Sequence, residues 1–376
     1  MQAENLRLHQ IYGIPAPAPI PTVRLQQEYF LIERDVFVKR PDLVLTGRTV
    51  YGAKSTQPKE NQSLIGRKQA FIRAVEAEAA QQGLILHMRG REVLCDALHH
   101  PPLTQIMHRS AEKQGLVCLF HEKPFAGIQG SDTFYHWSPA IDVNHALARL
   151  TISTAVTHAV HEHADLFGLF FTSFEEKDSV FVFRAAQNFE GSAFPVCVLH
   201  AIIADSLQLL LDETKDALQD GRDLSEEETR RLVLPVLQQK IKTSRSVDTA
   251  LFGALLDQKT ERCFQGILSA KELRHRYEHF VESYVKAQGR EAHVMLDCFY
   301  RISVIPSEKA LHAAQELEKM LAHMADLGWE AKAKVFSELG LSKMKDLRSH
   351  VDAMEAIVDD ALWPMPKYQE LLYGVQ

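Results

Sequence analysis

The sequence of 376 residues is poor in cysteine and carries no excess of positive charge. Lys and Arg number 42 against 49 Asp and Glu, so the formal net charge of -7 removes the electrostatic case for nucleic-acid binding. An odd number of widely spaced cysteines favours reduced, mostly buried thiols over a disulfide framework or a zinc site. They are Cys95, Cys118, Cys197, Cys263 and Cys298.

Long hydrophobic runs are also lacking, so the sequence predicts no membrane span. The first ten residues, MQAENLRLHQ, are polar and lack the apolar core of a signal peptide. Prolines at 15, 17, 19 and 21 favour an extended polyproline segment, so residues 1–24 are predicted to form a surface tail. A cytoplasmic protein is therefore expected.

What the chain does contain is strands mixed with helices in its first half and helices alone afterwards. Strands are predicted over 26–38, 84–95, 115–127 and 179–185, and helices over 67–83, 101–114 and 142–167. In the helix over 67–83, Phe71, Val75 and Ala79 share one face, and Gly83 suits its C-terminal cap. A boundary is predicted near Gly221, where Ser225 and Glu228 form a capping box. The pattern predicts an α+β fold with a domain over 25–218 and an all-helical domain over 219–376.

Several blocks, in the same order, resemble type III glutamine synthetase. They are QQEYFLIERDVFVKRPDLVLTGRTVYGA, GLVCLFHEKPFAGIQGSDTFYHWS, HADLF, FRAAQNFEGSAFPVCVLHAIIADSL, LSAKELRHRYEHFVESYVK and LWPMPKYQELL. The resemblance implies a curved antiparallel sheet that holds two divalent cations, and ATP-dependent joining of ammonia to glutamate. It also implies that 25–218 lacks the family's N-terminal β-grasp domain and its long flap segment.

The resemblance places metal ligands on the strands, and most of these positions are neutral here. The pair of carboxylates on the first strand is replaced by Gln26 and Glu28. In RGREVLCDALHH, Glu92 is kept and His99 replaces the second glutamate. The metal histidine of the later loop is Phe134. Val182 replaces a further glutamate, beside a retained Arg184. Two carboxylates cannot offset two divalent cations, so the two-metal site is not expected to form.

The loop KPFAGIQGSDTFYHWS retains residues that the resemblance assigns to nucleotide binding. A remnant ATP site is predicted at Lys123, Gly130, Ser131, His136 and Ser138, with Lys123 and Arg184 as remnants of the catalytic machinery. The alternative is that this loop survives because the fold needs it. Likewise, Glu28, Glu92 and His99 could hold a single Mn, Mg or Zn ion, or could be leftover side chains on an open sheet.

Three functions stay open at this point. The first is a non-catalytic member with a binding or regulatory role. The second is a single-metal or ATP-dependent, amide-bond-forming enzyme that acts on glutamate or another small molecule. The third is an authentic ligase completed by another chain. Expected partners are further copies of the chain or a full-length glutamine synthetase, with no nucleic acid and no membrane.

Overall fold

The computed structural model describes residues 1–12, 21–53, 62–128, 130–139, 146–177, 180–186, 193–219, 249–302 and 305–373. It has two compact units that interleave along the chain. Unit 1 comprises Met1–Gln26, Asp96–His100 and Phe134–Glu278; unit 2 comprises Gln27–Cys95, Pro101–Thr133 and His279–Gln376. This division differs from the three consecutive domains predicted over 1–24, 25–218 and 219–376. The predicted boundary at Gly221 and its capping box lie outside the described residues.

Unit 1 contains an antiparallel sheet with one buried face. Its strand order is β1-β6-β8-β7, from Thr22–Glu28, Thr133–Ser138, Val180–Ala185 and Phe171–Lys177. In β6 and β8 the buried side chains, such as Trp137, Phe181 and Phe183, alternate with half-buried ones. Paired positions include Phe134 opposite Arg184 and His136 opposite Val182. The alternation therefore sorts this sheet into a core face and a half-exposed face.

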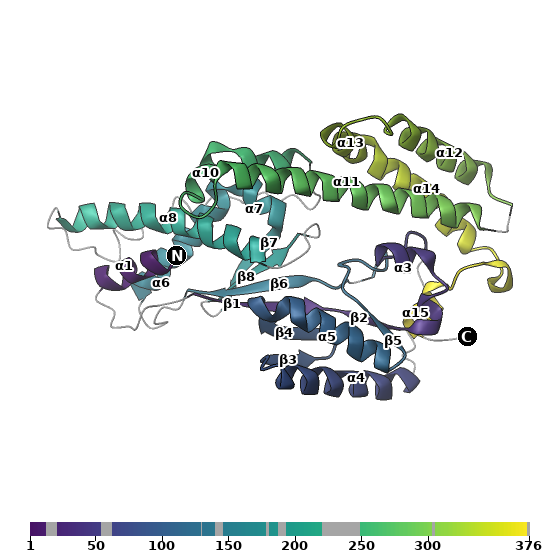
Figure 1. Ribbon diagram of the computed structural model, residues 1–376, viewed down its shortest axis with the longest axis horizontal. Helices are drawn as coiled ribbons and strands as arrows, with labels where there is room; N and C mark the ends of the chain where they lie inside the picture. The colour runs from purple at the N-terminus through teal and green to yellow at the C-terminus, as the bar shows by residue number, and fades with distance from the viewer. Residues whose placement is uncertain are drawn as a thin grey trace. The chain divides into compact units, whose positions relative to one another are not determined.

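The helices of unit 1 pack around α8, Ala193–Gln219 (Figure 1). Its neighbours are α1 (Gln2–Ile11), α6 (Ala146–Glu162), α7 (Ala164–Phe170) and α10 (Gln258–Cys263). The unit also includes the 3-10 helices Ala97–His99 and Thr249–Leu256 and the start of α11, Ala270–Tyr300. Contrary to the expectation from sequence, Ala193–Asp212 is long and apolar enough to cross a membrane. Half of that stretch is buried within the protein, as in the core helix of many globular proteins.

Unit 2 begins with the end of β1 beside a hairpin and contains a second, two-stranded sheet. The hairpin joins β3 (Leu86–Arg89) to β4 (Glu92–Asp96) through Gly90, whose φ is +62°. In the second sheet, β2 (Phe30–Glu33) pairs antiparallel with β5 (Leu116–Leu119). Helices α4 (Gln62–Gln81) and α5 (His100–Lys113) supply core side chains between them and the hairpin. As predicted, Phe71, Val75 and Ala79 are buried and Gly83 is left-handed.

Unit 2 has further helices, of which those after residue 300 follow the predicted all-helical pattern. They are α2 (Arg34–Phe37), α3 (Pro41–Thr46), α12 (Glu308–His323), α13 (Trp329–Val335), a π-helical turn (Phe336–Gly340), α14 (Leu341–Glu355), the 3-10 turn Asp360–Leu362 and α15 (Tyr368–Tyr373). Ala314 and Leu317 on α12, and Leu347 and Val351 on α14, are fully buried. The antiparallel sheets and the helical C-terminal region make the fold α+β.

Four local expectations are corrected. The predicted strand over 26–38 is divided into the end of β1 at Glu28 and β2 at Phe30–Glu33, which belong to different sheets, and α2 follows. The predicted strand over 84–95 is the β3–β4 hairpin, since Gly90 permits a left-handed turn. The predicted helix over 142–167 breaks at His163, and β7 was not predicted. Within the predicted tail, Gln2–Ile11 is helical and Asn5 donates to the Pro139 carbonyl at 2.8 Å.

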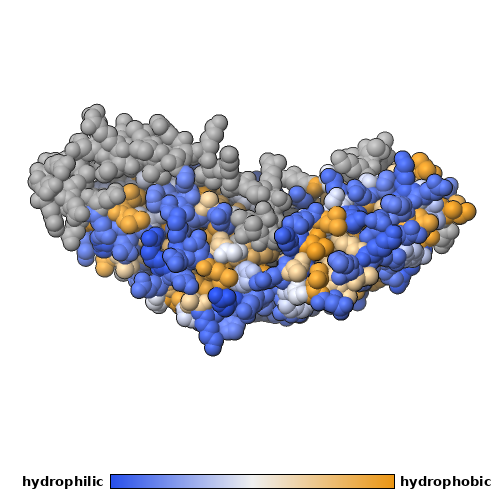
Figure 2. Space-filling model, turned by 90° about the horizontal axis from the view of Figure 1, so that it is seen from above, coloured by the Kyte–Doolittle hydropathy of each residue, from blue (hydrophilic) through white to orange (hydrophobic). Residues whose placement is uncertain are grey.

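The surface is largely polar where it is seen. On the face shown in Figure 2, hydrophobic residues lie in small groups set among hydrophilic ones. The most exposed large apolar side chains include Ile85, Ile305 and Ile357, which are far apart in the sequence. Scattered exposed apolar residues are normal on protein surfaces and do not by themselves mark a binding site.

A buried cluster of polar side chains fixes the second unit. Arg40 and Asp42 are fully buried and form a bidentate ion pair, with Arg40 Nε 2.8 Å from Asp42 Oδ1. Arg40 also donates to the carbonyls of Tyr51 and Pro366 at 2.7 and 2.8 Å, and Asp42 accepts from the Val50 amide at 2.8 Å. A buried charge pair is tolerated only when its remaining groups are hydrogen-bonded, as they are here.

The Tyr368 hydroxyl joins three further segments in the same unit. It accepts from the Ala126 amide at 2.9 Å and from Arg348 at 2.8 Å, which fills both acceptor positions. Its proton therefore goes to Thr49 Oγ1 at 2.7 Å, and Thr49 in turn donates to the Pro124 carbonyl at 2.8 Å. Gly52 is required beside this ring, because a Cβ there would lie 2.0 Å from Tyr368 Cε1.

Replacing Tyr368 with Phe should lower the free energy of unfolding by about 1–3 kcal/mol, because it leaves buried donors and acceptors unpaired. Urea unfolding measures this change. Tyr300→Phe, at an exposed tyrosine, is the matched control and should change stability by less than about 0.5 kcal/mol. Equal effects of the two substitutions would contradict the role given to Tyr368.

Glu355 makes the stability of the second unit depend on pH. Burial raises its pKa from 4.5 to about 7; Arg40 opposes the rise and Asp352 adds to it. The folded protein therefore holds this proton more tightly than the unfolded chain. The associated stability is present below about pH 4.5 and is lost, by up to about 3 kcal/mol, as the pH rises through 7.

Glu355→Gln should remove this loss, so that the variant gains stability relative to the parent protein between pH 5 and 8. Urea unfolding at a series of pH values measures the difference. Glu338→Gln, at an exposed glutamate, should follow the parent at every pH. A Glu355→Gln curve parallel to that of the parent would rule out Glu355 as the titrating group.

Candidate functional site

The half-exposed face of the first unit's sheet carries the positions that the resemblance assigns to metal and nucleotide. Gln26, Phe134, His136, Val182 and Arg184 are all half-buried and alternate with core residues. Tyr135, between Phe134 and His136 on β6, faces the core, where its ring lies edge-on to Phe171 with centroids 5.6 Å apart. The period of the strand therefore leaves Phe134 and Val182 as the apolar replacements on this face.

A direct contact between Gln26 and His136 occupies the middle of this face. His136 Nε2 lies 2.8 Å from Gln26 Oε1, and because an amide oxygen only accepts, the imidazole nitrogen donates. Burial lowers the pKa of His136; Arg24 lowers it further, while Glu175 opposes the shift. The lowered pKa favours the neutral ring, and its Nε2 donates to Gln26.

One carboxylate on this side of the sheet was missed by the sequence reasoning. Glu175 on β7 is exposed and pairs in register with Val182 on β8. The strand that carries it was not predicted, because FTSFEEK combines a short apolar start with a charged end. Gln26, Phe134 and Val182 on this face are neutral, so its charge comes from side chains such as Arg184 and, at the edge, Glu175.

The two carboxylates that the resemblance retains lie together in the second unit. Glu28 and Glu92 line a cavity of about 460 Å³ with Arg89, Gly90 and Arg91. Burial raises the pKa of Glu28, and the nearby carboxylates of Asp132 and Glu92 add to the rise. The Asp132 amide, which donates to Glu28 Oε2 at 3.0 Å, opposes it. Asp132 is thus a third acidic group that sequence reasoning did not single out.

The retained loop of the second unit is bound into the structure through its backbone. The Ser131 amide donates to the Glu122 carbonyl at 2.7 Å, and a Cβ on Gly130 would lie 1.6 Å from that carbonyl oxygen. Ser131 is buried, whereas Lys123 is exposed and its amide donates to His121 Nδ1 at 3.1 Å. These contacts give Gly130 and Ser131 a role in the fold itself.

Two predicted ligand sets are divided between the units. Lys123, Gly130 and Ser131 belong to unit 2, while His136 and Ser138 belong to unit 1. Glu28 and Glu92 belong to unit 2, and His99, on the 3-10 turn Ala97–His99, belongs to unit 1. The remnant ATP site and the single-metal site therefore stay predictions.

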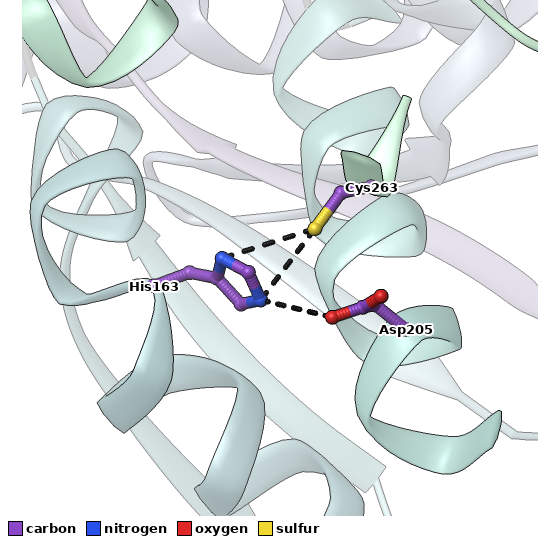
Figure 3. A group of neighbouring side chains, drawn as sticks. All are labelled: His163, Asp205 and Cys263. Atoms are coloured by element: carbon purple, nitrogen blue, oxygen red, sulfur yellow. Dashed lines mark hydrogen bonds and ion pairs between the residues drawn. The ribbon is translucent and has the colours of Figure 1, made fainter. Parts of the chain in front are cut away.

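One group of metal-ligand side chains, among the residues that the structure describes, has its ligand atoms within 4.8 Å of one another: His163, Asp205 and Cys263 (Figure 3). His163 lies between α6 and α7, Asp205 on α8 and Cys263 at the end of α10. Sequence reasoning missed this group because its members have no local spacing. The general expectation of mostly buried thiols is confirmed, since Cys197 alone of the five free cysteines is half-buried.

Replacing Gln26 with Glu should raise the pKa of His136, because a carboxylate at hydrogen-bonding distance stabilises the imidazolium ion. Titration of the imidazole proton resonances by NMR measures this pKa in the parent protein and in the variant. Gln69→Glu, at an exposed position on α4, serves as the control and should leave it unchanged. An unaltered value in Gln26→Glu would contradict the contact between the two side chains.

Comparison with known proteins agrees with the resemblance, although no family model matches the chain. A type-3 glutamine synthetase of Dictyostelium discoideum is 25% identical over 519 aligned positions, covering 94% of this chain and 70% of that protein. Glutamine synthetases of Butyrivibrio fibrisolvens and Bacteroides fragilis (strain YCH46) are 32% and 26% identical, over 32% and 54% of this chain. The matches cover only 20% and 31% of those two bacterial proteins.

A solved structure described as apo GmaS without ligand has a TM-score of 0.38 at 16% identity, covering 73% of this chain and 76% of that one. This similarity is too distant to bear on the site. The sequence matches and the ordered blocks agree: the chain is similar to the type-3 glutamine synthetases.

Proposed function

We propose that this chain does not form glutamine and acts instead as a binding or regulatory protein built on a glutamine-synthetase-like fold. The observation that carries the proposal is the half-exposed sheet face of the first unit. Gln26, Phe134 and Val182 occupy positions that the resemblance assigns to charged or imidazole ligands, and Gln26 engages His136 Nε2. Neutral side chains there cannot offset the charge of two divalent cations.

The retained loop supports the same proposal. Its backbone is held by Tyr368, Thr49 and Glu122, so its preservation is explained by the fold without a nucleotide. Lys123 is the member of the loop that projects an exposed charge. A phosphate on this loop would meet the exposed Lys123, whereas the Ser131 hydroxyl, although it has no hydrogen-bond partner, is buried away from the surface.

The direct test is an assay for glutamine formation from glutamate, ammonia and ATP with Mg²⁺ or Mn²⁺, run beside an active type-3 glutamine synthetase. We expect no glutamine above the level without protein. Glutamine formed in proportion to the purified chain, and lost in Glu28→Gln, would overturn the proposal and favour the authentic ligase.

The second candidate function, a single-metal or ATP-dependent enzyme, is favoured by the carboxylates of the second unit. Asp132 and Glu92 both raise the pKa of Glu28, and a divalent cation in the adjoining cavity would relieve this repulsion. Under this candidate, calorimetric titration of metal-free protein with Mn²⁺ should give saturable binding that ATP strengthens.

Glu92→Gln should then weaken Mn²⁺ binding by at least about tenfold, since even indirect partners of a metal are worth about 10–100-fold in affinity. Glu112→Gln, at an exposed glutamate paired with Arg34 in the same unit, is the control and should bind as the parent does. No heat with Mn²⁺, with or without ATP, would remove the enzyme candidate and leave the binding role.

We further propose, from the resemblance, that the partner is a full-length glutamine synthetase or a second copy of the chain, in the cytoplasm. Size-exclusion chromatography of the chain alone and mixed with such a synthetase distinguishes these partners. Elution of the chain as a monomer in both experiments would exclude both.

A further inference from the structure

Three side chains in the helical part of the first unit converge on one point away from the half-exposed sheet face. His163 occupies the break between α6 and α7, where its amide donates to Ala159 and its carbonyl accepts from Phe167 at 2.7 Å. This break fixes the backbone of His163, and its side chain is 2% exposed. Asp205 and Cys263 reach it from α8 and α10, which pack together (Figure 3).

Two of the separations have the lengths of edges in a tetrahedral metal site, and all three ligand atoms lie within 4.8 Å of one another. His163 Nε2 lies 3.4 Å from Asp205 Oδ2 and 3.5 Å from Cys263 Sγ. With zinc bonds of about 2.0–2.1 Å to N and O and about 2.3 Å to S, a tetrahedron has N···O and N···S edges of about 3.3 and 3.6 Å. These two separations are those of a zinc-sized ion's ligands, but Sγ also lies 3.8 Å from Nδ1, so the imidazole must turn to aim Nε2 at the ion.

A Cys-His-Asp catalytic triad is a poorer description of the same residues. In such a triad the thiol and the carboxylate face opposite nitrogens of the imidazole. Here one nitrogen, Nε2, is nearest to both, while Nδ1 lies 3.8 Å from the sulfur (Figure 3). A nucleophilic cysteine also needs a lowered pKa, whereas burial, with Asp205 nearby, raises that of Cys263 to about 12.

We propose that His163 Nε2, Asp205 Oδ2 and Cys263 Sγ bind one transition-metal ion of the zinc class. Mixed nitrogen, sulfur and carboxylate donors suit zinc, whereas Mg²⁺ and Ca²⁺ prefer oxygen alone. On binding, the sulfur–metal bond replaces the sulfur–hydrogen bond and the proton leaves to solvent. Arg262, whose Nη2 lies 3.2 Å from Asp205 Oδ2, would turn outward or remain as a partner of that carboxylate.

Two of the three proposed ligands border a groove. Asp205 and Cys263 line a cavity of about 1110 Å³, together with Cys197, His200 and Arg262. Three protein ligands with one open position are typical of zinc sites that exchange water or a small ligand. The inference is independent of the proposed function, because the resemblance assigns no metal to these three residues.

Cobalt titration of the tag-free, metal-stripped protein tests the site. Co²⁺ should bind with one-to-one stoichiometry, give the thiolate-to-cobalt charge-transfer band, and be displaced by Zn²⁺. Cys263→Ser should lose that band and bind Co²⁺ at least about tenfold more weakly. Cys197→Ser, which alters a half-buried thiol of the same groove, is the matched control. It should keep the charge-transfer band and the Co²⁺ affinity of the parent protein.

Thiol alkylation followed by mass spectrometry tests the unmodified chain, should Cys263→Ser fail to fold. Zn²⁺ should slow alkylation of Cys263 but not of Cys197, and a chelator should reverse the protection. Absence of the charge-transfer band in the parent protein, equal loss in Cys197→Ser, or equal alkylation of Cys263 with and without Zn²⁺ would overturn the proposal.

Discussion

The buried ion pair between Arg40 and Asp42 is the constraint on which the second unit depends. Both side chains are fully buried, so each hydrogen bond that either lacked would cost free energy without compensation by water. The pair recruits the carbonyls of Tyr51 and Pro366 and the amide of Val50. Segments far apart in the sequence are thereby held at fixed separations.

The hydroxyl of Tyr368 extends this constraint to the loop that begins at Lys123. Its bonds to Thr49 and Ala126 join the block that contains Tyr368 to two others that carry the family resemblance, and its bond to Arg348 adds a helix outside those blocks. These blocks are thus explained by packing, whatever the loop once bound. Residues that the fold needs can be retained even where ligand-binding residues have been replaced. The reason is that replacing a residue of the fold lowers the stability of the protein.

In the sheet of the first unit, core residues are retained while the residues at ligand positions are replaced. On its core face Trp137, Phe181 and Phe183 are buried. The fold requires this burial whether or not the protein is catalytic. Its half-exposed face carries Gln26, Phe134 and Val182 where the resemblance expects metal ligands, beside His136 and Arg184. The same strands therefore combine a maintained core with an altered surface, and the helical part of the unit offers a separate set of metal donors.

The sequence by itself determined the α+β class, most helices and the core face of α4, because periodicity and turn residues act over short distances. It also identified Gln26, Phe134 and Val182 as replacements, since ordered blocks can be matched residue by residue. It did not reveal the contact of Gln26 with His136, the added carboxylate Asp132, or the group of His163, Asp205 and Cys263. Those depend on which strands pair and which helices pack, and such long-range contacts leave no local pattern along the chain. Only the tertiary structure decided them.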